Sequence, residues 1–511
     1  MDIFYNKKFY KKHIVFVAFF FIAVFLLTSS VSGADYRDIR NSVNSASSGD
    51  TINLNNTAYT SDGSSIRIEG KNLTISGSSD SNRATLNGGD RSGAFLIDSD
   101  SKVIFRFINF VGASSPRFHA IASNGTVLIE NCTFSSCNGD SGAAIYLYEN
   151  ADSSRIVNCR FIDNKADNTD DNDYTAGGAI CINEAAGVEV RNSYFSGNTA
   201  LNSGGAITIR NNAQNTKIIG CTFVNNSAPN GGAIYNQLST GTIIEGCTFT
   251  NNKATELGGA IYSINTLNIS NSNFNNNSAK NGGAIYSTNQ MRITGSSFAT
   301  NTATDGGAIY STNTLSISSS SFNKNTAKGN GGGLFLSGSH QSTITGNSKF
   351  TSNSAKNGGA IYTSSPLTIF SSNLDSNEAS TDGGAIYSTN TLSIGSSSFN
   401  KNTAKGNGGA LFLSGSHQST ITGNSKFTSN SAKNGGAIYT SSPLTISSSN
   451  LASNKVSANG GAIYSTNSLN VTGGIISGNS AIYGSGIYNS GVLRLNSVGL
   501  LANIAKVSIA I

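Results

Sequence analysis

The chain has 511 residues, of which only 12% are charged, and it combines 57 glycines with four prolines and no tryptophan. Its formal net charge of +6 depends partly on Lys7, Lys8, Lys11 and Lys12, so the remainder is close to neutral. No basic run in this remainder supports nucleic-acid binding. The apolar residues that recur at regular spacing argue against a disordered chain.

The N-terminal segment has the pattern of an export signal. Four lysines precede an apolar stretch from Ile14 to Leu27, which is followed by small residues up to Ala34. This order predicts a secretory signal peptide over residues 1–34. An uncleaved anchor is the alternative, although the stretch is shorter than the roughly 20 residues of a membrane span. We therefore expect a secreted or cell-surface protein without a membrane span in its mature chain.

Residues 35–140 are less regular than the rest of the chain. The segment Tyr36–Val43 has the spacing of a short amphipathic helix, and short strand-like stretches follow it. An open solenoid end exposes unpaired strand edges and its core, so we predict that this helix caps the first coil.

Four of the six cysteines, Cys132, Cys159, Cys221 and Cys247, share one repeat position, two residues before a phenylalanine. We expect these thiols to point inward as small core residues. In an oxidising compartment, a bridge between Cys132 and Cys159 or between Cys221 and Cys247 is the alternative. Without a Cys-x-x-Cys pair, the sequence gives little support to a zinc site.

An insertion in one coil carries the chain's only acidic cluster, and this cluster is a weak candidate for a Ca²⁺ loop. A solvated acidic loop is the simpler interpretation. The cluster comprises Asp167, Asp170, Asp171 and Asp173.

The phrase Gly-Gly-Ala-Ile-Tyr, followed by Phe-x-x-Asn, recurs fourteen times within residues 141–491. A clean copy begins at Gly282 and Gly283 and continues to Phe298 and Asn301, and from Gly177 onward the first glycines of successive copies are 24 to 27 residues apart. A fixed period of this length predicts a solenoid in which each repeat is one coil.

The substitutions within the phrase alternate between apolar and variable positions, as they do in β-strands. We expect the isoleucine column to face inward and the tyrosine column to face outward. A second strand follows, for example at Leu267 and Ile269, and Phe274 is expected to begin the turn that ends at Asn277. Glycines at the corners and a ladder of stacked asparagines complete an all-β fold, a parallel β-helix of about fourteen regular coils.

The C-terminal half contains a duplicated block of coils and an apolar final segment. Residues 304–380 and 381–457 match at all but six of 77 positions, so a block of three coils has been duplicated together with its histidine, His340 becoming His417. Residues 492–511 form an apolar tail, which we expect to dock on the last coil unless the chain is truncated or partnered.

The paired motifs Gly-Gly-Ala-Ile and Phe-x-x-Asn resemble the repeat of the polymorphic outer-membrane protein family over roughly residues 142–490. The chain is also similar to the adhesin-like β-helix surface proteins of methanogenic archaea. These resemblances imply a right-handed, single-stranded β-helix of the pectate-lyase-like class, displayed at the cell surface and used in adhesion. They leave the mode of surface attachment open.

We therefore expect a non-catalytic adhesin-like protein without a cofactor. Its partner would be a glycan or a surface protein of another cell, with no role for nucleic acid. The outward aromatic column is the candidate binding face, and the alternative is that its rings only stabilise neighbouring strands. The candidate residues are Tyr235, Tyr262, Tyr286, Tyr310, Phe335, Tyr362, Tyr387, Phe412, Tyr439 and Tyr464.

The alternative function is a polysaccharide lyase or hydrolase, since many β-helices are such enzymes. This chemistry requires clustered carboxylates and a base on one outer groove. Arg91, Asp98, Asp100 and Arg106 lie in an irregular coil and do not suggest a catalytic arrangement. The enzyme hypothesis therefore rests on analogy between folds.

Overall fold

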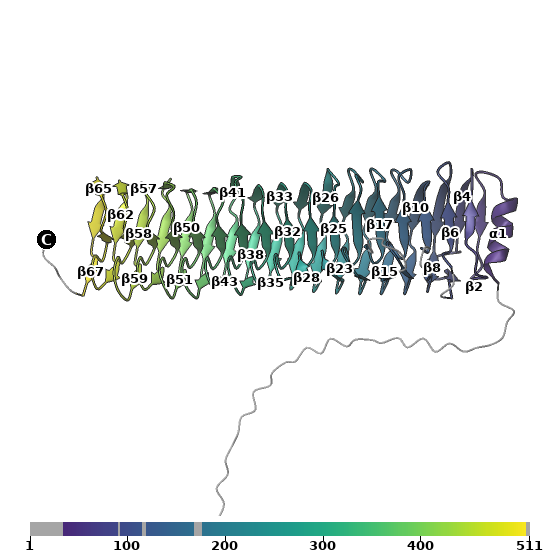
Figure 1. Ribbon diagram of the computed structural model, residues 1–511, viewed down its shortest axis with the longest axis horizontal. Coiled ribbons are helices and arrows are strands. Elements are labelled where there is room, and N and C mark those ends of the chain that lie inside the picture. The colour runs from purple at the N-terminus through teal and green to yellow at the C-terminus, as the bar shows by residue number, and fades with distance from the viewer. Residues whose placement is uncertain (1–33, 90–91, 115–118, 168–175, 507–511) are drawn as a thin grey trace, which may run out of the picture. The chain divides into compact units, whose positions relative to one another are not determined.

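The computed structural model describes residues 34–89, 92–114, 119–167 and 176–506. The expected signal peptide therefore lies almost entirely outside the described residues. Within them, a single helix, α1 (Tyr36–Ser45), precedes a long series of short strands that stack coil upon coil in chain order (Figure 1). No helix in these ranges is long and apolar enough to cross a membrane.

One coil illustrates the architecture. It contains β30 (Leu267–Ser270), β31 (Asn273–Asn275) and β32 (Ile285–Ser287). Each strand pairs in parallel with its equivalent in the next coil, so Ile269 is in register with Ile293, Phe274 with Phe298 and Tyr286 with Tyr310. The parallel β-helix expected from the repeat is thereby confirmed.

Three long sheets run along the stack, and we name each sheet by a side chain that recurs in it. The leucine sheet has 18 strands, from β1 (Thr51–Asn53) to β65 (Leu493–Asn496). The phenylalanine sheet also has 18 strands, from β2 (Ala58–Thr60) to β66 (Gly499–Leu501). There are therefore about 18 coils, more than the fourteen regular ones, because the irregular N-terminal segment and residues 492–506 form coils of the same kind.

The tyrosine sheet has 17 strands and carries the repeated Ile-Tyr segments. Two further sheets of five and nine very short strands lie at the corner between the phenylalanine and tyrosine sheets, from β12 (Asn138–Gly139) to β28 (Lys253–Leu257) and from β35 (Thr302–Ala303) to β67 (Ile504–Ala505). The tyrosine sheet comprises β3 (Ile66–Ile68), β6 (Phe95–Ile97), β9 (Ile121–Ser123), β13 (Ile145–Leu147), β17 (Ile180–Asn183), β21 (Ile207–Arg210), β25 (Ile234–Asn236), β29 (Ile261–Ser263), β32, β36 (Ile309–Ser311), β40 (Leu334–Leu336), β44 (Ile361–Thr363), β48 (Ile386–Ser388), β52 (Leu411–Leu413), β56 (Ile438–Thr440), β60 (Ile463–Ser465) and β64 (Ile487–Asn489).

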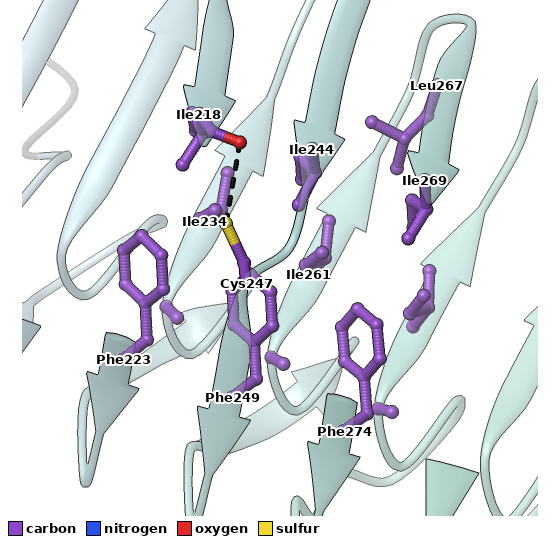
Figure 2. Close-up of a cluster of buried hydrophobic side chains, with 14 of the residues drawn as sticks. Ile218, Phe223, Ile234, Ile244, Cys247, Phe249, Ile261, Leu267, Ile269 and Phe274 are labelled. Atoms are coloured by element: carbon purple, nitrogen blue, oxygen red, sulfur yellow. Dashed lines mark hydrogen bonds between the residues drawn. The ribbon is translucent and has the colours of Figure 1, made fainter. Parts of the chain in front are cut away.

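The core is a set of columns of identical side chains. The phenylalanine rings from Phe110 to Phe350 stack with centroids 4.6–5.0 Å apart and planes within 8° of parallel. Figure 2 shows three of them, Phe223, Phe249 and Phe274, in one row beside the isoleucine columns. The sequence-based placement of Phe274 at the start of a turn was wrong, because this residue is the buried middle of β31.

The asparagine ladder is present and buried. The Asn325 Nδ2 group donates to Oδ1 of Asn353 at 3.0 Å and to the Phe298 carbonyl at 3.0 Å. The same contacts recur from Asn164 to Asn503, and the Cys137 backbone N–H donates to Asn164 Oδ1 at the start of the series. Each amide therefore satisfies two neighbouring coils, which is a structural role.

The cysteine position is a second hydrogen-bonded column. The Cys247 thiol donates to the Ile218 carbonyl at 3.4 Å (Figure 2), and its sulfur accepts from the Cys221 backbone N–H at 3.4 Å. Serine hydroxyls make the equivalent bonds in later coils, as Ser272 does with the Cys247 N–H at 3.1 Å. All six cysteines are buried free thiols, so neither of the two possible bridges is formed.

The glycine pair serves two different needs at one corner. Gly282 has a φ of +64°, a conformation that residues with a Cβ adopt at a cost. A Cβ on Gly283 would lie 2.1 Å from the Gly307 carbonyl oxygen of the next coil. The first glycine is therefore required by backbone conformation and the second by the close approach of two coils.

The two ends of the stack differ. At the N-terminal end, α1 is capped by Asp35 and buries Tyr36, Ile39 and Val43 against the first coil, which confirms the expected capping helix. At the other end, residues 492–506 are not the expected tail but a further coil with β65, β66 and β67. Its apolar side chains, Val492, Leu493, Leu495, Leu500, Leu501 and Ile504, are 41–66% exposed.

Candidate functional site

The aromatic column follows the outer surface of the tyrosine sheet. Strand register aligns Tyr262 with Tyr286, Tyr286 with Tyr310 and Tyr310 with Phe335, and this alignment continues to Tyr488. The aromatic residues from Tyr262 onward are partly exposed, whereas the residues directly before and after them in each strand are buried as far as Ile463 and Ser465. The predicted alternation of inward and outward positions is therefore present.

The rings of this column stack on one another. From Tyr286 to Tyr488, neighbouring centroids are 4.4–5.1 Å apart, with interplanar angles of 2–22°. Such spacing places each ring face against the next ring. A sugar packs its apolar side on an aromatic face, and these faces are already covered. Between Tyr286 and Tyr488, the column therefore presents ring edges and hydroxyl groups to the outside.

Three phenol groups of the column, those of Tyr286, Tyr362 and Tyr439, are neutral. Burial raises the pKa of the Tyr286, Tyr362 and Tyr439 hydroxyls, and neighbouring tyrosines raise it further. At neutral pH each hydroxyl can therefore donate one hydrogen bond and accept others. The exposed part of the column begins at Tyr262, since Tyr235 is only 4% exposed.

The column is interrupted toward the N-terminal end. Cys181 and Thr208 occupy the positions between Tyr146 and Tyr235, and both are fully buried although they lie on the outer side of the tyrosine sheet. Tyr146 itself is only 8% exposed. The outer surface of the tyrosine sheet is thus built differently here than along the regular stack.

A hollow of about 350 Å³ lies on the same side of the sheet, next to this interruption. Leu147 is in register with Ser123 and with Ile182, so the residues that follow them are neighbours across three coils. The lining residues are Asn124, Tyr148, Glu149, Asn183 and Glu184. We name this set the Tyr148 hollow.

The aromatic ring of the hollow is held from behind. The Tyr148 side chain is 40% exposed, and its ring centroid lies 4.4 Å from that of Tyr146. The Tyr146 ring contacts the His119 ring at 4.9 Å, and its hydroxyl accepts a hydrogen bond from Arg210 at 2.8 Å. His119 is itself bound to the Gly142 carbonyl at 3.1 Å. Tyr148 therefore rests on a buried support.

Burial is the main cause of the shifted pKa values of His119 and Tyr146, which lie behind the Tyr148 ring. It lowers the pKa of His119 to about 4, and the nearby Arg210 charge acts in the same direction. Burial also raises the pKa of Tyr146, with Cys181 contributing. At neutral pH, both His119 and Tyr146 are therefore uncharged.

The polar side chains around the ring form two hydrogen-bonded sets. In one, Asn150 Nδ2 donates to Asn124 Oδ1 at 3.1 Å and to Glu149 Oε1 at 3.4 Å. In the other, Asn183 Nδ2 donates to Glu184 Oε1 at 3.3 Å, while Arg210 Nε donates to Asn183 Oδ1 at 3.1 Å. These contacts orient carboxylates and amides on both sides of Tyr148.

The remaining sequence-based candidates are not brought together. Asp167 forms an ion pair with Lys165, while Asp170, Asp171 and Asp173 lie outside the described residues. No group of three or more histidine, cysteine or acidic side chains suited to a metal ion is found in the described ranges. Asp98 pairs instead with Arg67 at 2.9 Å, and Arg106 with Glu130 at 2.7 Å.

Sequence reasoning missed the Tyr148 hollow because its residues are not repeated. The available signal was the departure from the repeat, where cysteine and threonine replace tyrosine. Two residues further along these strands, Tyr148, Asn183 and Arg210 occupy the next outward position. An alignment of the coils by register would have placed these three side chains in one column.

Two known families match parts of the chain. Residues 167–298 and 205–392 match the right handed beta helix region, which agrees with the expected hand of the fold. Residues 396–414 and 419–441 match the Chlamydia polymorphic membrane protein repeat. Neither match bears on the resemblance to archaeal surface proteins. No curated protein sequence matches the chain.

Three solved structures are similar at low identity. A PL6 alginate lyase in complex with a trisaccharide is 13% identical, with a TM-score of 0.42, covering 70% of this chain and 82% of the lyase. The alginate lyase AlyF-OU02 in complex with G6 is 10% identical, with a TM-score of 0.39 and coverages of 72% and 82%. Tailspike protein 3 of bacteriophage CBA120 is 11% identical, with a TM-score of 0.22 and coverages of 94% and 60%. These likenesses are too distant for us to infer an activity. The chain is a right-handed parallel β-helix that contains polymorphic membrane protein repeats.

Proposed function

We propose that this chain is a secreted or cell-surface β-helix of the adhesin-like type, which binds a glycan or a surface protein of another cell and performs no catalysis. The proposal rests on one observation, which is that the repeated polar side chains form hydrogen bonds between coils. Asparagine amides, serine hydroxyls and cysteine thiols are consumed by bonds between coils. A solenoid of this kind supports a long surface, and its repeats need no chemistry of their own.

The match to polymorphic membrane protein repeats supports surface display. In this proposal, residues 1–34 direct export and are removed. Sequencing the N-terminus of protein recovered outside the producing cell tests this step, since an intact Met1 on the exported protein would contradict cleavage.

The main test is attachment. Beads coated with the chain should bind target cells or a glycan array, whereas beads coated with an unrelated protein should not. If the chain binds no cell and no glycan, the adhesin proposal fails.

Within this proposal, the ring edges and hydroxyls of the aromatic column form part of the contact surface. The triple variant Tyr286→Ser, Tyr310→Ser, Tyr387→Ser removes three of these rings and should weaken attachment. The matched control is Lys324→Ser, Lys349→Ser, Lys401→Ser, which changes three exposed residues in or directly after strands of the phenylalanine sheet. Equal attachment of both variants would assign the column a purely structural role.

The alternative function is a polysaccharide lyase or hydrolase. Incubation with pectin, polygalacturonate and alginate, followed by detection of new reducing ends and unsaturated products, separates the two functions. Depolymerisation that scales with protein concentration would overturn the non-catalytic proposal.

A further inference from the structure

The Tyr148 hollow is the place where the outer surface departs most clearly from the repeat. Along the regular stack, aromatic faces cover one another, so they are not available to a ligand. Tyr148 occupies the next outward position, where its neighbours in register are Asn124 and Asn183 instead of aromatic rings. Tyr148 as a residue is therefore 40% exposed.

We propose that the Tyr148 hollow is a binding site for a neutral sugar residue, which stacks on Tyr148 and is hydrogen-bonded by the amides and carboxylates around it. This inference deepens the adhesin proposal by naming a site and a ligand class, and it rests on that proposal only for its biological role.

The shape and chemistry of the hollow fit this ligand class. Its volume of about 350 Å³ is near the lower end of the roughly 300–1,000 Å³ typical of small-molecule sites, which suits one or two sugar rings. An aromatic face supplies apolar contact, while Asn124 and Asn183 supply donors and acceptors. Glu149 and Glu184 supply further acceptors for sugar hydroxyls, and charge makes these hydrogen bonds stronger than neutral ones.

The same carboxylates determine which sugars are excluded. Both Glu149 and Glu184 line the hollow, so a uronic acid would bring a third negative charge beside them. The single positive charge of Arg210, which bonds Asn183 and the Tyr146 hydroxyl, offsets only one of the two carboxylate charges. Like charges at short range are unfavourable. The site therefore favours neutral sugars over uronates.

The site is organised before any ligand arrives. Tyr148 rests on Tyr146, which is held by the buried His119 and by Arg210. Asn150 and Asn183 hold the two glutamates through hydrogen bonds. Because the ring and its polar neighbours are already oriented, binding costs little side-chain ordering.

The test measures binding of soluble disaccharides to the full chain by saturation-transfer NMR and calorimetry. The probes are cellobiose, mannobiose and N,N′-diacetylchitobiose as neutral sugars and digalacturonate as the acidic one. At least one neutral disaccharide should bind, with transfer strongest at one sugar ring, and digalacturonate should not. Absence of neutral binding, or preferred binding of digalacturonate, overturns the proposal.

Variants locate the site. Tyr148→Ala should weaken neutral binding about tenfold, whereas Tyr148→Phe, which keeps the ring, should retain it. Tyr483→Ala is the matched control, since Tyr483 is an equally exposed tyrosine (38%) of a distant coil. The double variant Glu149→Gln, Glu184→Gln should weaken neutral binding and reduce the rejection of digalacturonate. Unchanged binding in Tyr148→Ala would place the ligand elsewhere and refute this site.

Failure of this site can be distinguished from failure of the proposed function. In one outcome, the full chain attaches to cells, and the Tyr148→Ala variant attaches equally well and binds disaccharides with unchanged affinity. This outcome refutes only the sugar site. If the chain binds neutral disaccharides at Tyr148 but attaches to no cell or glycan surface, the site stands and the adhesin role is refuted.

Discussion

At the residue scale, single side chains hold neighbouring coils together. Asn325 is fully buried, and its side-chain amide makes four hydrogen bonds. Its Oδ1 accepts from the backbone N–H and from Nδ2 of Asn301, and its Nδ2 donates to Phe298 and Asn353, all at 3.0 Å. Removing the amide deprives buried donors and acceptors of the two neighbouring coils of this partner.

Asn325→Ala should therefore lower the free energy of local opening by about 3 kcal/mol or more, because each unsatisfied buried group costs about 1–3 kcal/mol. Hydrogen exchange should report the loss first at the Asn301 amide. Asn323→Ala is the control, since Asn323 is an exposed residue of β38 (Ser321–Asn323). If the two variants exchange alike at residue 301, the ladder does not carry the stability assigned to it.

The buried histidine predicts a pH dependence. His119 has a folded pKa of about 4 against 6.5 for an unperturbed histidine, because it is buried beside Tyr146 and Arg210. The unfolded state therefore binds more protons between these values. The contribution of His119 to stability is complete above pH 6.5 and falls as the pH decreases toward 4, by up to about 3 kcal/mol.

His119→Asn should remove this part of the pH dependence while leaving the carboxylate-dependent loss at lower pH. Denaturant midpoints measured from pH 8 to pH 4 check the expected slope. His340→Asn and His417→Asn are controls because both histidines are exposed. An unchanged slope in His119→Asn would show that this residue is not the group that titrates.

At the scale of one structural element, the corner before each tyrosine-sheet strand depends on close contact between coils. A Cβ on Gly332 would lie 2.2 Å from the Gly359 carbonyl oxygen, whereas on Gly333 it would lie 2.9 Å from that of Ala360. The equivalents of Gly333 in neighbouring coils, such as Ala308 and Ala360, already carry a Cβ.

Gly332→Ala should therefore destabilise the stack by about 1–3 kcal/mol, the usual cost of overpacking. Gly333→Ala should be neutral or slightly stabilising, because it restricts the unfolded chain at a position that accepts alanine. Thermal unfolding of the two single variants gives the comparison. Equal effects would contradict the separate roles of the two glycines.

Part of the arrangement of strands and side-chain columns could be predicted from the sequence alone. Alternation around Ile285 predicted the inward and outward columns, and the recurrence of asparagine predicted a hydrogen-bonded ladder, whose burial the structure adds. The strand at Phe274 was missed because a three-residue strand beside a corner has too few positions to display a period. The stacking of Tyr286 on Tyr310 depends on ring orientation, and the Tyr148 hollow joins residues from different coils. Neither is contained in a repeat pattern.

At the scale of the whole molecule, the coils form one continuous core, so length should be adjustable in whole coils. The duplicated blocks 304–380 and 381–457 each span three coils and begin at the same corner. Their equivalent strands carry the same buried residues in register, such as Phe322 and Phe399 or Ile317 and Ile394. Removal of one block therefore brings matching coil surfaces together.

Deletion of residues 381–457 should yield a folded, cooperative protein whose stack is shorter by about 14 Å, since each coil adds about 4.8 Å. Circular dichroism and small-angle scattering measure the fold and the shortening. Deletion of residues 381–419 is the control, because it ends within β53 (Ser419–Thr422) and interrupts the register of a coil. Stability depends mainly on contacts between neighbouring coils in such a solenoid, so the whole-block deletion should unfold near the midpoint of the full chain and the control should aggregate. If both deletions behave alike, the coil is not the unit of folding in this protein.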